Sequence, residues 1–578
     1  MLTRIRIRNF KRFNDVEFEL GKAVVLIGPN NSGKTTALQA LALWDIGVRR
    51  WNEKRKGKSS PEKRPGVTVN RRDLASIPVP VANLLWHNLH VRDVLKSKEN
   101  GEPRQKTENV RMDIIVDGVT NDTAWSCGLE FDYANEESFY CRPLRTGSDG
   151  ERMLVPDEAG SARVAFLPPM SGLADREFVK ELGEIGVLIG QGQTAQVLRN
   201  LCYQIYKPEG SEHWDDLVKH IRTLFGVELL EPKYISERSE ITMAYKDKRG
   251  NNLDLSSSGR GLQQTLLLLG HLYANPGAVL LLDEPDAHLE ILRQRQTYNL
   301  LIQIAEQQGS QIIAASHSEV VLNEAADRDV VIAFVGKPHR IDNRNSQVLK
   351  SLRDIGFDQY YLAEERGWVL YLENSTDLAI LQTFSRSLDH EAQDYLERPF
   401  VKYVETNLPS KAREHFFGLQ EAKSDLVGVA IFDRLDKELQ SAKGLTEIMW
   451  ARREIENYFC MESVLLAYAT HDLPDDLFGR AESPQREQAM REAIAEVTGA
   501  LQTLNKPDPW SPDLKATDEF FDPLFKKYFQ KLGLPLQLRK SDYHILAGLV
   551  SKEALDAEIT QKLDAIVAVA DKARPRTA

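Results

Sequence analysis

Residues 255–290 constrain this chain most, because they combine a serine–glycine turn with an unbroken apolar run that ends in acidic residues. Residues 279–282 are all apolar, without the alternation of a half-exposed strand, which is typical of a buried parallel strand. Asp283 and Glu284 follow directly, and the carboxyl ends of parallel strands are where such sheets bind ligands. The stretch therefore predicts a Walker B site, in which Asp283 holds Mg²⁺ and Glu284 orients or activates the attacking water.

A Walker A motif matches this Walker B site. Residues 28–35, GPNNSGKT, fit the pattern G-x-x-x-x-G-K-[ST] between an apolar strand and a helical run. Its glycines let the backbone wrap phosphates, the lysine reaches the β and γ oxygens, and the final threonine ligates Mg²⁺. Serine and glycine before the helix at 262–273 suit a second phosphate contact. The predicted nucleotide-binding residues are Asn30, Asn31, Gly33, Lys34, Thr35, Thr36, Ser258, Gly259 and Asp283, with Thr35 and Asp283 as the Mg²⁺ ligands.

His317 ends the next predicted strand, residues 311–315. A histidine at that position can donate a hydrogen bond beside a γ-phosphate, so we expect it to act with Glu284 in ATP hydrolysis.

Composition narrows the class of protein. With 578 residues, 42% of them hydrophobic and 28% charged, the chain is typical of a globular protein with at least two domains. It contains no run of 18 apolar residues, so we expect no membrane span. Its first residues alternate apolar and basic, which predicts a strand and not a signal peptide. Four scattered cysteines predict buried, reduced thiols, so we expect a cytoplasmic protein. The net charge of −11 argues against a uniformly basic nucleic-acid-binding surface.

Two segments interrupt the first predicted domain. Basic residues gather in 49–110, either as a solvated surface insertion or as a contact to nucleic-acid phosphates that Trp51 and Trp86 would assist. Residues 175–235 are predicted to form a helical insertion, which could be a subdomain or a dimerisation arm.

A second α/β pattern begins near residue 365. Strands are predicted at 368–372, 401–404 and 426–432, and Glu373 and Asp433 follow the first and the third of them. A third acidic cluster contains Glu454 and Glu456, which would share a face if residues 452–458 were extended. Converging carboxylates repel one another, and Mg²⁺ or Mn²⁺ relieves that cost. Two such ions about 4 Å apart can support phosphodiester hydrolysis.

The motif order resembles that of ABC-type ATPases, in particular the SMC and RecF branch. In that class the signature serine contacts the ATP of the other protomer, which implies a homo-oligomer assembled through its ATPase heads. Residues 365–465 resemble a Toprim domain. Together the two parts resemble the OLD (overcoming lysogenisation defect) family of ATP-dependent endonucleases, which includes the nuclease subunit of Gabija-type phage defence.

The Toprim resemblance rests on three motifs. Glu373 and Asp377 match the first, although Asn374 replaces its glycine. Asp433 matches the second, but Leu435 stands where a second aspartate belongs and Asp436 lies one residue further. Glu454, Glu456 and Asn457 match the third, an acidic residue, a spacer and Glu-Asn. The resemblance implies catalytic or metal-ligand roles for a larger set: Glu373, Asp377, Asp433, Asp436, Glu454 and Glu456, with Lys540 as a lysine that stabilises the transition state.

The expected fold class is thus α/β: an ABC-type P-loop ATPase domain over residues 1–350 with a helical insertion, a Toprim-like α/β domain over 365–465, and a mainly helical C-terminal region over 466–578. We expect a disordered tail from Lys572.

The resemblance implies an ATP-controlled, divalent-metal-dependent DNA endonuclease in anti-phage defence, with ATP and Mg²⁺ or Mn²⁺ as cofactors. It implies DNA as a partner and a second defence-system subunit as a further candidate partner. The alternative is an ABC-type ATPase sensor or scaffold whose degenerate Toprim-like module binds or controls a partner effector.

Overall fold

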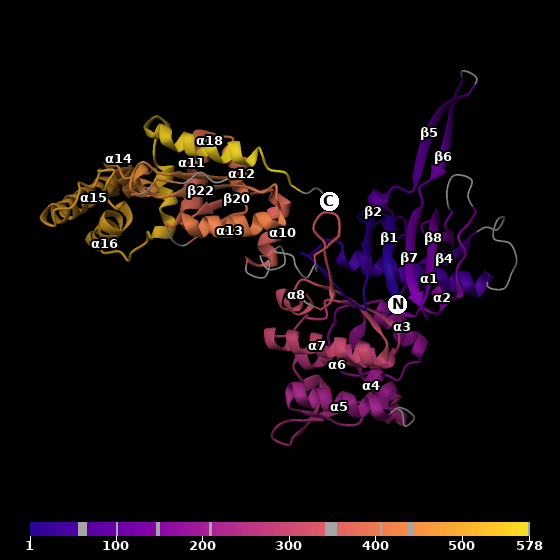
Figure 1. Cartoon of the computed structure of the whole chain (residues 1–578). Coiled ribbons are helices and arrows are strands. Elements are labelled where there is room, and N and C mark those ends of the chain that lie inside the picture. Colours follow the sequence, from indigo (N-terminus) through magenta and orange to yellow (C-terminus); the bar gives the residue numbers. More distant parts are fainter. Residues whose placement is uncertain are drawn as a thin grey trace. The chain divides into compact units, whose positions relative to one another are not determined.

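The chain forms two compact units, residues 1–349 and 350–577. The computed structural model describes all residues except 56–65, 100–101, 146–150, 207–210, 327, 342–354, 405–406, 437, 440–442, 475 and 576–578. Each unit is described by itself below, with the element labels of Figure 1.

An antiparallel sheet opens the first unit, in the strand order β2-β1-β7-β8-β9-β4. In β1, Ile5 and Ile7 are fully buried. The arginines that alternate with them, Arg4 and Arg6, face outward and pair with acidic residues of β2. This alternation confirms the strand that the first residues predict. The strands are β1 (Leu2–Phe10), β2 (Phe13–Glu19), β4 (Val67–Asn70), β7 (Met112–Thr120), β8 (Thr123–Asn135) and β9 (Ser138–Pro143).

The second sheet of this unit carries the nucleotide motifs, in the order β10-β16-β17-β3-β18-β19, with all pairs parallel except β18 with β19. Its central strands are apolar and buried throughout, as unbroken apolar runs predict. The strands are β3 (Ala23–Ile27), β10 (Val164–Leu167), β16 (Val279–Asp283), β17 (Gln311–Ser316), β18 (Val330–Ala333) and β19 (His339–Arg340). Consequently the carboxyl ends of β3, β16 and β17 lie side by side at one edge.

Helix α1 (Lys34–Arg55) packs between the two sheets. Trp44 is completely buried in it, stacks on Trp125 with 6.1 Å between ring centroids, and donates its indole N–H to the carbonyl oxygen of Cys127 at 3.0 Å. The helix that begins at the Walker A lysine is therefore fixed in one core with both sheets. All four cysteines are buried and free, as predicted.

The predicted helical insertion is helical only in part. Helices α3 (Leu182–Gly190), α4 (Leu198–Tyr206) and α5 (Ser211–Phe225) are present, and α4 and α5 pack on α6 (Arg260–Ala274) (Figure 1). Residues 228–235 are not helical, because they form strands that pair with the segment after them. These short strands are β11 (Glu228–Leu229), β12 (Lys233–Ile235), β13 (Glu240–Thr242), β14 (Ala244–Lys246) and β15 (Asn252–Asp254).

The basic segment at 49–110 is more ordered than a surface loop. Its first basic residues continue α1, and β5 (Arg92–Glu99) and β6 (Glu102–Asn109) form a hairpin that projects from the unit (Figure 1). Trp86 is buried and donates its N–H to the carbonyl oxygen of Val110 at 2.7 Å. Trp86 therefore cannot stack on nucleobases, and that part of the prediction is wrong. The basic residues between 56 and 65 lie outside the described residues. Other helices of this unit are α2 (Asp157–Ser161), α7 (Ile291–Gln308) and α8 (Glu319–Ala325).

The second unit is built on a fully parallel sheet in the order β21-β20-β22-β23. The strands are β20 (Trp368–Leu372), β21 (Val401–Tyr403), β22 (Val427–Phe432) and β23 (Leu445–Met449), of which β23 was not predicted. Helices α10 (Phe357–Arg366) and α13 (Pro409–Ala422) pack on the sheet, as do α11 (Ser375–Leu388) and α18 (Ala557–Ala570), and α12 (Ala392–Glu397) packs against α11 and α18.

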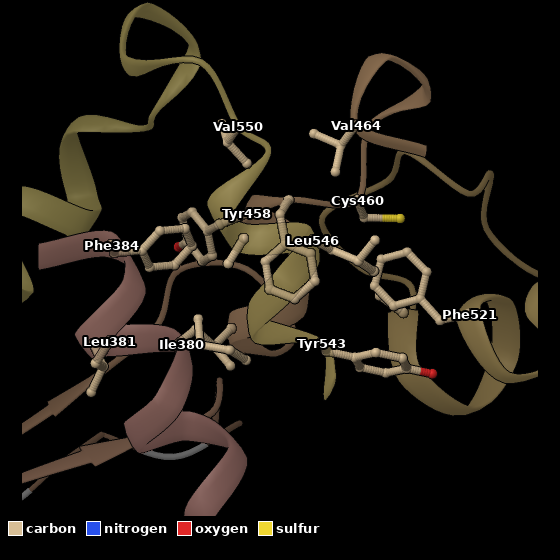
Figure 2. Close-up of a cluster of buried hydrophobic side chains, with 14 of the residues drawn as sticks. Ile380, Leu381, Phe384, Tyr458, Cys460, Val464, Phe521, Tyr543, Leu546 and Val550 are labelled. Carbon is tan, nitrogen blue, oxygen red and sulfur yellow. The ribbon is translucent and has the colours of Figure 1, made fainter. Parts of the chain in front are cut away.

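One hydrophobic core joins this sheet to the C-terminal helices. Figure 2 shows Phe384 of α11 grouped with Tyr458, Phe521 and Leu546, which come from segments far apart in sequence. The remaining helices are α14 (Glu462–Thr470), α15 (Leu477–Thr503), α16 (Asp522–Lys531) and α17 (His544–Gly548).

The tail from Lys572 departs from its prediction. Lys423 donates from Nζ to the carbonyl oxygen of Arg574 at 3.0 Å, and Ala573 packs on the core. The expected disorder is therefore wrong for residues 572–575.

Candidate functional site

The Walker A loop has the backbone that a phosphate-binding loop needs. Gly33 has φ of +106°, and a Cβ there would lie 2.9 Å from the Phe13 ring, so only glycine fits. Lys34 donates from Nζ to the carbonyl oxygens of Gly28 at 2.5 Å and Pro29 at 2.7 Å. These bonds hold the ammonium over the loop, where phosphate oxygens would replace the carbonyls. Asn30, Asn31, Thr35 and Thr36 occupy the same turn and the first turn of α1, and Asn31 has φ of +62°.

The Walker A and Walker B motifs are in direct contact. The Thr35 hydroxyl donates to Oδ1 of Asp283 at 3.0 Å. Burial raises the pKa of Asp283 to about 6, with a further contribution from Glu284 and opposition from the Thr35 hydroxyl. Burial also lowers the pKa of Lys34, against the opposing effect of three carboxylates, Glu284, Asp283 and Asp286. A hydroxyl and a carboxylate side by side are ligands that Mg²⁺ takes, so these residues fit the predicted ion.

Glu284 and His317 lie together beyond these ligands. His317 Nδ1 is 3.8 Å from Glu284 Oε1, and both side chains are partly exposed. Glu284 has φ of +48°, which is uncommon for a residue with a side chain and is found where surrounding structure enforces it. Its N–H donates to the carbonyl oxygen of Ala315 at 2.8 Å, which holds the two strand ends in register.

The signature residues lie at the start of α6. Gly259 is the N-cap of this helix, it is exposed, and a Cβ added to it would meet no heavy atom within 4 Å. The Ser258 hydroxyl donates to the carbonyl oxygen of Leu255 at 2.7 Å. The first N–H groups of a helix lack intrahelical acceptors and favour anions. This end of α6 is therefore open to a ligand from outside.

A cavity of about 190 Å³ lies at the carboxyl edge of the parallel sheet in the second unit. We call it the carboxylate cavity. It is lined by Glu373, Asn374, Asp377, Asn407, Asp433, Arg434, Arg453, Glu454, Glu456, Lys515 and Lys540. All of the predicted residues of this site except Asp436 are thus brought together. Asp436 is exposed and does not line the cavity, because the chain has left the sheet edge by that point.

The two glutamates of the third acidic cluster reach the cavity by a different backbone from the extended one considered above. Ile455–Tyr458 is a 3₁₀-helix with Glu454 as its N-cap. The Asn457 side chain fixes this turn, since its Oδ1 accepts from the N–H of Glu454 at 2.9 Å and its Nδ2 donates to the carbonyl oxygen of Leu514 at 3.0 Å. The extended alternative is therefore wrong, although Glu454 and Glu456 both line the cavity.

Backbone N–H groups hold two of the five carboxylates. Asp377 accepts from the N–H groups of Glu373 at 3.1 Å and Asn374 at 3.3 Å, and it thereby caps α11. Glu454 accepts from the N–H of Thr517 at 2.5 Å. Among the described residues we find no such bond to the other three carboxylates, Glu373, Asp433 and Glu456.

The carboxylates raise one another's proton affinity. Burial raises the pKa of Asp433 to about 8, with further contributions from Asp377 and Glu373. Burial and then Glu373 raise the pKa of Asp377 to about 7, against its backbone hydrogen bonds. Burial also raises the pKa of Glu456 well above its usual range. Burial opposes protonation of Lys540, but the carboxylates around it outweigh burial and raise its pKa. The cavity therefore has an excess of negative charge that a cation would relieve.

The donor set of the cavity fits a hard divalent ion, since its carboxylate oxygens are what Mg²⁺ and Mn²⁺ prefer. In the part of the chain that the structure describes, no three acidic, histidine or cysteine side chains are already gathered around one point as ligands. Side chains would therefore have to turn toward an arriving ion.

Sequence reasoning missed four residues of the cavity: Asn407, Arg434, Arg453 and Lys515. Arg434 and Arg453 stand beside Asp433 and Glu454 in the sequence, which could have indicated them. Lys515 follows a proline-rich loop and offered no such signal.

Comparisons with known proteins agree on the first unit. Residues 1–45 match a family described as "AAA ATPase domain", and residues 204–323 match one described as "AAA domain, putative AbiEii toxin, Type IV TA system". An OLD nuclease of Thermus scotoductus is 42% identical over 43 residues, which is 7% of this chain and only 8% of that protein.

Solved structures with a similar arrangement include an SMC head domain from Thermotoga maritima, at 14% identity, a TM-score of 0.33 and coverage of 59% of this chain and 98% of that one. Another is the SMC head domain of Pyrococcus furiosus bound to the C-terminal domain of ScpA. It has 12% identity and a TM-score of 0.33, with coverage of 61% of this chain and 99% of that one. Scores this low carry no argument about function.

The first unit is therefore an ATP-binding ATPase domain of the AAA/ABC class. The chain also shares a short similarity with an OLD nuclease. No described helix is both long enough and apolar enough to cross a membrane.

Proposed function

We propose that this protein is an ATP-controlled, divalent-metal-dependent DNA endonuclease of the OLD type, with a Toprim-like second unit. The observation that carries the proposal is the carboxylate cavity. Three parts of the chain, which follow β20, β22 and β23, bring five carboxylates to one edge of a parallel sheet, and two later segments add Lys515 and Lys540. Such an edge is the usual binding site of an α/β sheet.

Within the cavity the residues divide into two groups. Glu373, Asp433 and Glu456 would hold the ion, while Asp377 and Glu454, which are bound to backbone N–H groups, would keep the loops in place. A bound divalent ion supplies Lewis-acid chemistry that polarises a phosphodiester and promotes attack by water. Lys540 would donate to the phosphate oxygens, and its raised pKa keeps the side chain cationic for that task.

In the first unit Lys34 would bind the β and γ phosphates, Thr35 and Asp283 the Mg²⁺ ion, and Glu284 with His317 the attacking water. Ser258 and Gly259, open at the start of α6, would contact the ATP of a second copy, so ATP would join two ATPase heads.

The biological setting rests on the resemblance alone. It supports a cytoplasmic role in anti-phage defence, with DNA as substrate and a second defence-system subunit as partner.

One observation favours the alternative of an ATPase scaffold with a degenerate Toprim-like module. Leu435 replaces an expected aspartate, and the next acidic residue, Asp436, is exposed and outside the cavity. The cavity therefore lacks the second aspartate of that Toprim motif, which counts against a site for two ions.

Incubating the pure protein with supercoiled plasmid separates the two functions. The nuclease proposal predicts nicked or linear DNA with Mg²⁺ or Mn²⁺, a rate that ATP changes, and no cleavage in EDTA until Mn²⁺ is added back. Intact plasmid with both metals, with and without ATP, would favour the scaffold.

A further inference from the structure

A second cavity of the same unit, of about 500 Å³, lies between β21 and α13. Its lining includes Lys402, Tyr403, Lys411, Glu414, His415 and Gly418. Two lysines against one glutamate give these residues a net positive charge, in contrast to the carboxylate cavity. We call it the basic cavity.

His415 presents a hydrogen-bond donor without an acceptor. The Tyr371 hydroxyl lies 2.9 Å from Nδ1 of His415, and Tyr371 is completely buried. A hydroxyl in that position satisfies its own proton by donating to Nδ1, which leaves the proton of a neutral imidazole on Nε2. Burial, assisted by Lys402, lowers the pKa of His415 to about 4, so the ring is neutral at pH 7.

Nε2 of His415 is itself buried and has no hydrogen-bond partner among the described residues. With a turn of the imidazole toward the cavity, this N–H would join the two ammonium groups in binding an oxyanion that enters there.

The two cavities have lining residues close together in the sequence, Val404 in the basic cavity and Asn407 in the carboxylate cavity. Val404, which lines the basic cavity, donates its N–H to the carbonyl oxygen of Leu372 at 3.0 Å, one residue before Glu373. Asn407 lines the carboxylate cavity and donates to the carbonyl oxygen of Asp433 at 3.3 Å. Three residues span at most about 11 Å, and a DNA strand carries one charge per roughly 3.4 Å of rise. Val404 and Asn407 therefore lie no further apart than a few nucleotides of a DNA strand.

We propose that the basic cavity binds a backbone phosphate of the DNA strand whose cleavable phosphodiester lies in the carboxylate cavity, with Lys402, Lys411 and the His415 Nε2–H as its donors. This inference rests on the proposed nuclease function. Such a contact positions the strand without reading its sequence. It also offsets the repulsion between DNA and the five carboxylates.

The test compares DNA binding by the full-length Lys402→Ala/Lys411→Ala variant with that by Lys526→Ala/Lys552→Ala. The control removes two exposed lysines from the same unit at positions that line neither cavity. Fluorescence anisotropy with a labelled single strand and a labelled duplex, in EDTA and over about 50 to 200 mM salt, gives the affinity and its salt slope. Melting temperatures establish that both variants are folded.

The expected result is a several-fold loss of affinity for every sequence and a salt slope lower by about 1 in the first variant, with wild-type binding in the control. If both variants bind DNA equally well and the wild type cleaves plasmid, the proposed phosphate contact in the basic cavity is wrong but the nuclease function stands. A wild type that neither binds nor cleaves DNA overturns the nuclease function as well. Binding of inorganic phosphate by the wild type, with unchanged DNA affinity in the first variant, would indicate a free-phosphate site and contradict the inference.

Discussion

Raising the pH in the absence of divalent ions should destabilise the second unit. The pKa of Asp433 is about 8 in the folded protein and 3.8 for the free side chain, so the folded state keeps this proton to higher pH. Its contribution to stability is complete below about pH 4 and is lost as the pH rises to about 8. At 1.36 kcal/mol per pH unit the total has an upper bound of about 6 kcal/mol, of which about 2–3 kcal/mol is lost between pH 6 and 8.

Denaturant unfolding of the full-length protein in EDTA, at intervals from pH 6 to 9, measures this loss. Asp433→Asn removes the titrating group at nearly constant size and should flatten the pH dependence. Asp436→Asn is the matched control, because Asp436 is exposed and outside the cavity. Saturating Mg²⁺ should restore stability at high pH, since a bound cation favours the ionised carboxylates. Stability that is constant or rises over this range, or an unchanged slope in Asp433→Asn, would refute the reasoning.

Other consequences concern nucleotide chemistry and packing. Lys34→Ala should abolish nucleotide binding, measured with a fluorescent ATP analogue, because it removes the cation held over the loop; Glu284→Gln should retain binding but slow hydrolysis, and a wild-type rate would contradict the Walker B assignment. Ser258→Arg should leave ATP binding intact and lower turnover by blocking the partner's γ-phosphate; unchanged turnover counts against head-to-head assembly. Phe384→Ala should lower the free energy of unfolding by about 3–5 kcal/mol, since the ring is fully buried; a loss below 1 kcal/mol would show that this core is loosely packed.

Sequence patterns predicted the parallel strands well. The runs at 279–282, 312–315 and 368–372 are apolar without interruption, and every residue of the strands they form is buried. Position along the chain then indicated which carboxylates share an edge, because parallel strands end together.

Local patterns failed where distant partners decide the backbone. Nothing near Glu454 shows that Leu514 and Thr517 fix its turn, since those residues come from a loop some 60 positions later. For the same reason Lys515 was missed, and the tail at Arg574 was expected to be free although Lys423 binds it.

The prediction for Trp86 was wrong because the sequence does not show that its side chain is buried. Trp86 follows a basic segment and resembles a base-stacking residue, yet it packs edge-on against Tyr133 and Phe139 within the core. A charged neighbourhood in sequence does not show which way a ring points.

Plasmid cleavage by matched variants tests the proposed nuclease most directly. Glu373→Ala and Asp433→Ala should each abolish metal-dependent cleavage while ATP hydrolysis continues, because the nucleotide residues lie in the other unit. Asp436→Ala should cleave as the wild type does. Cleavage that persists in the Glu373→Ala/Asp433→Ala double variant would contradict the assignment of the carboxylate cavity as the nuclease site.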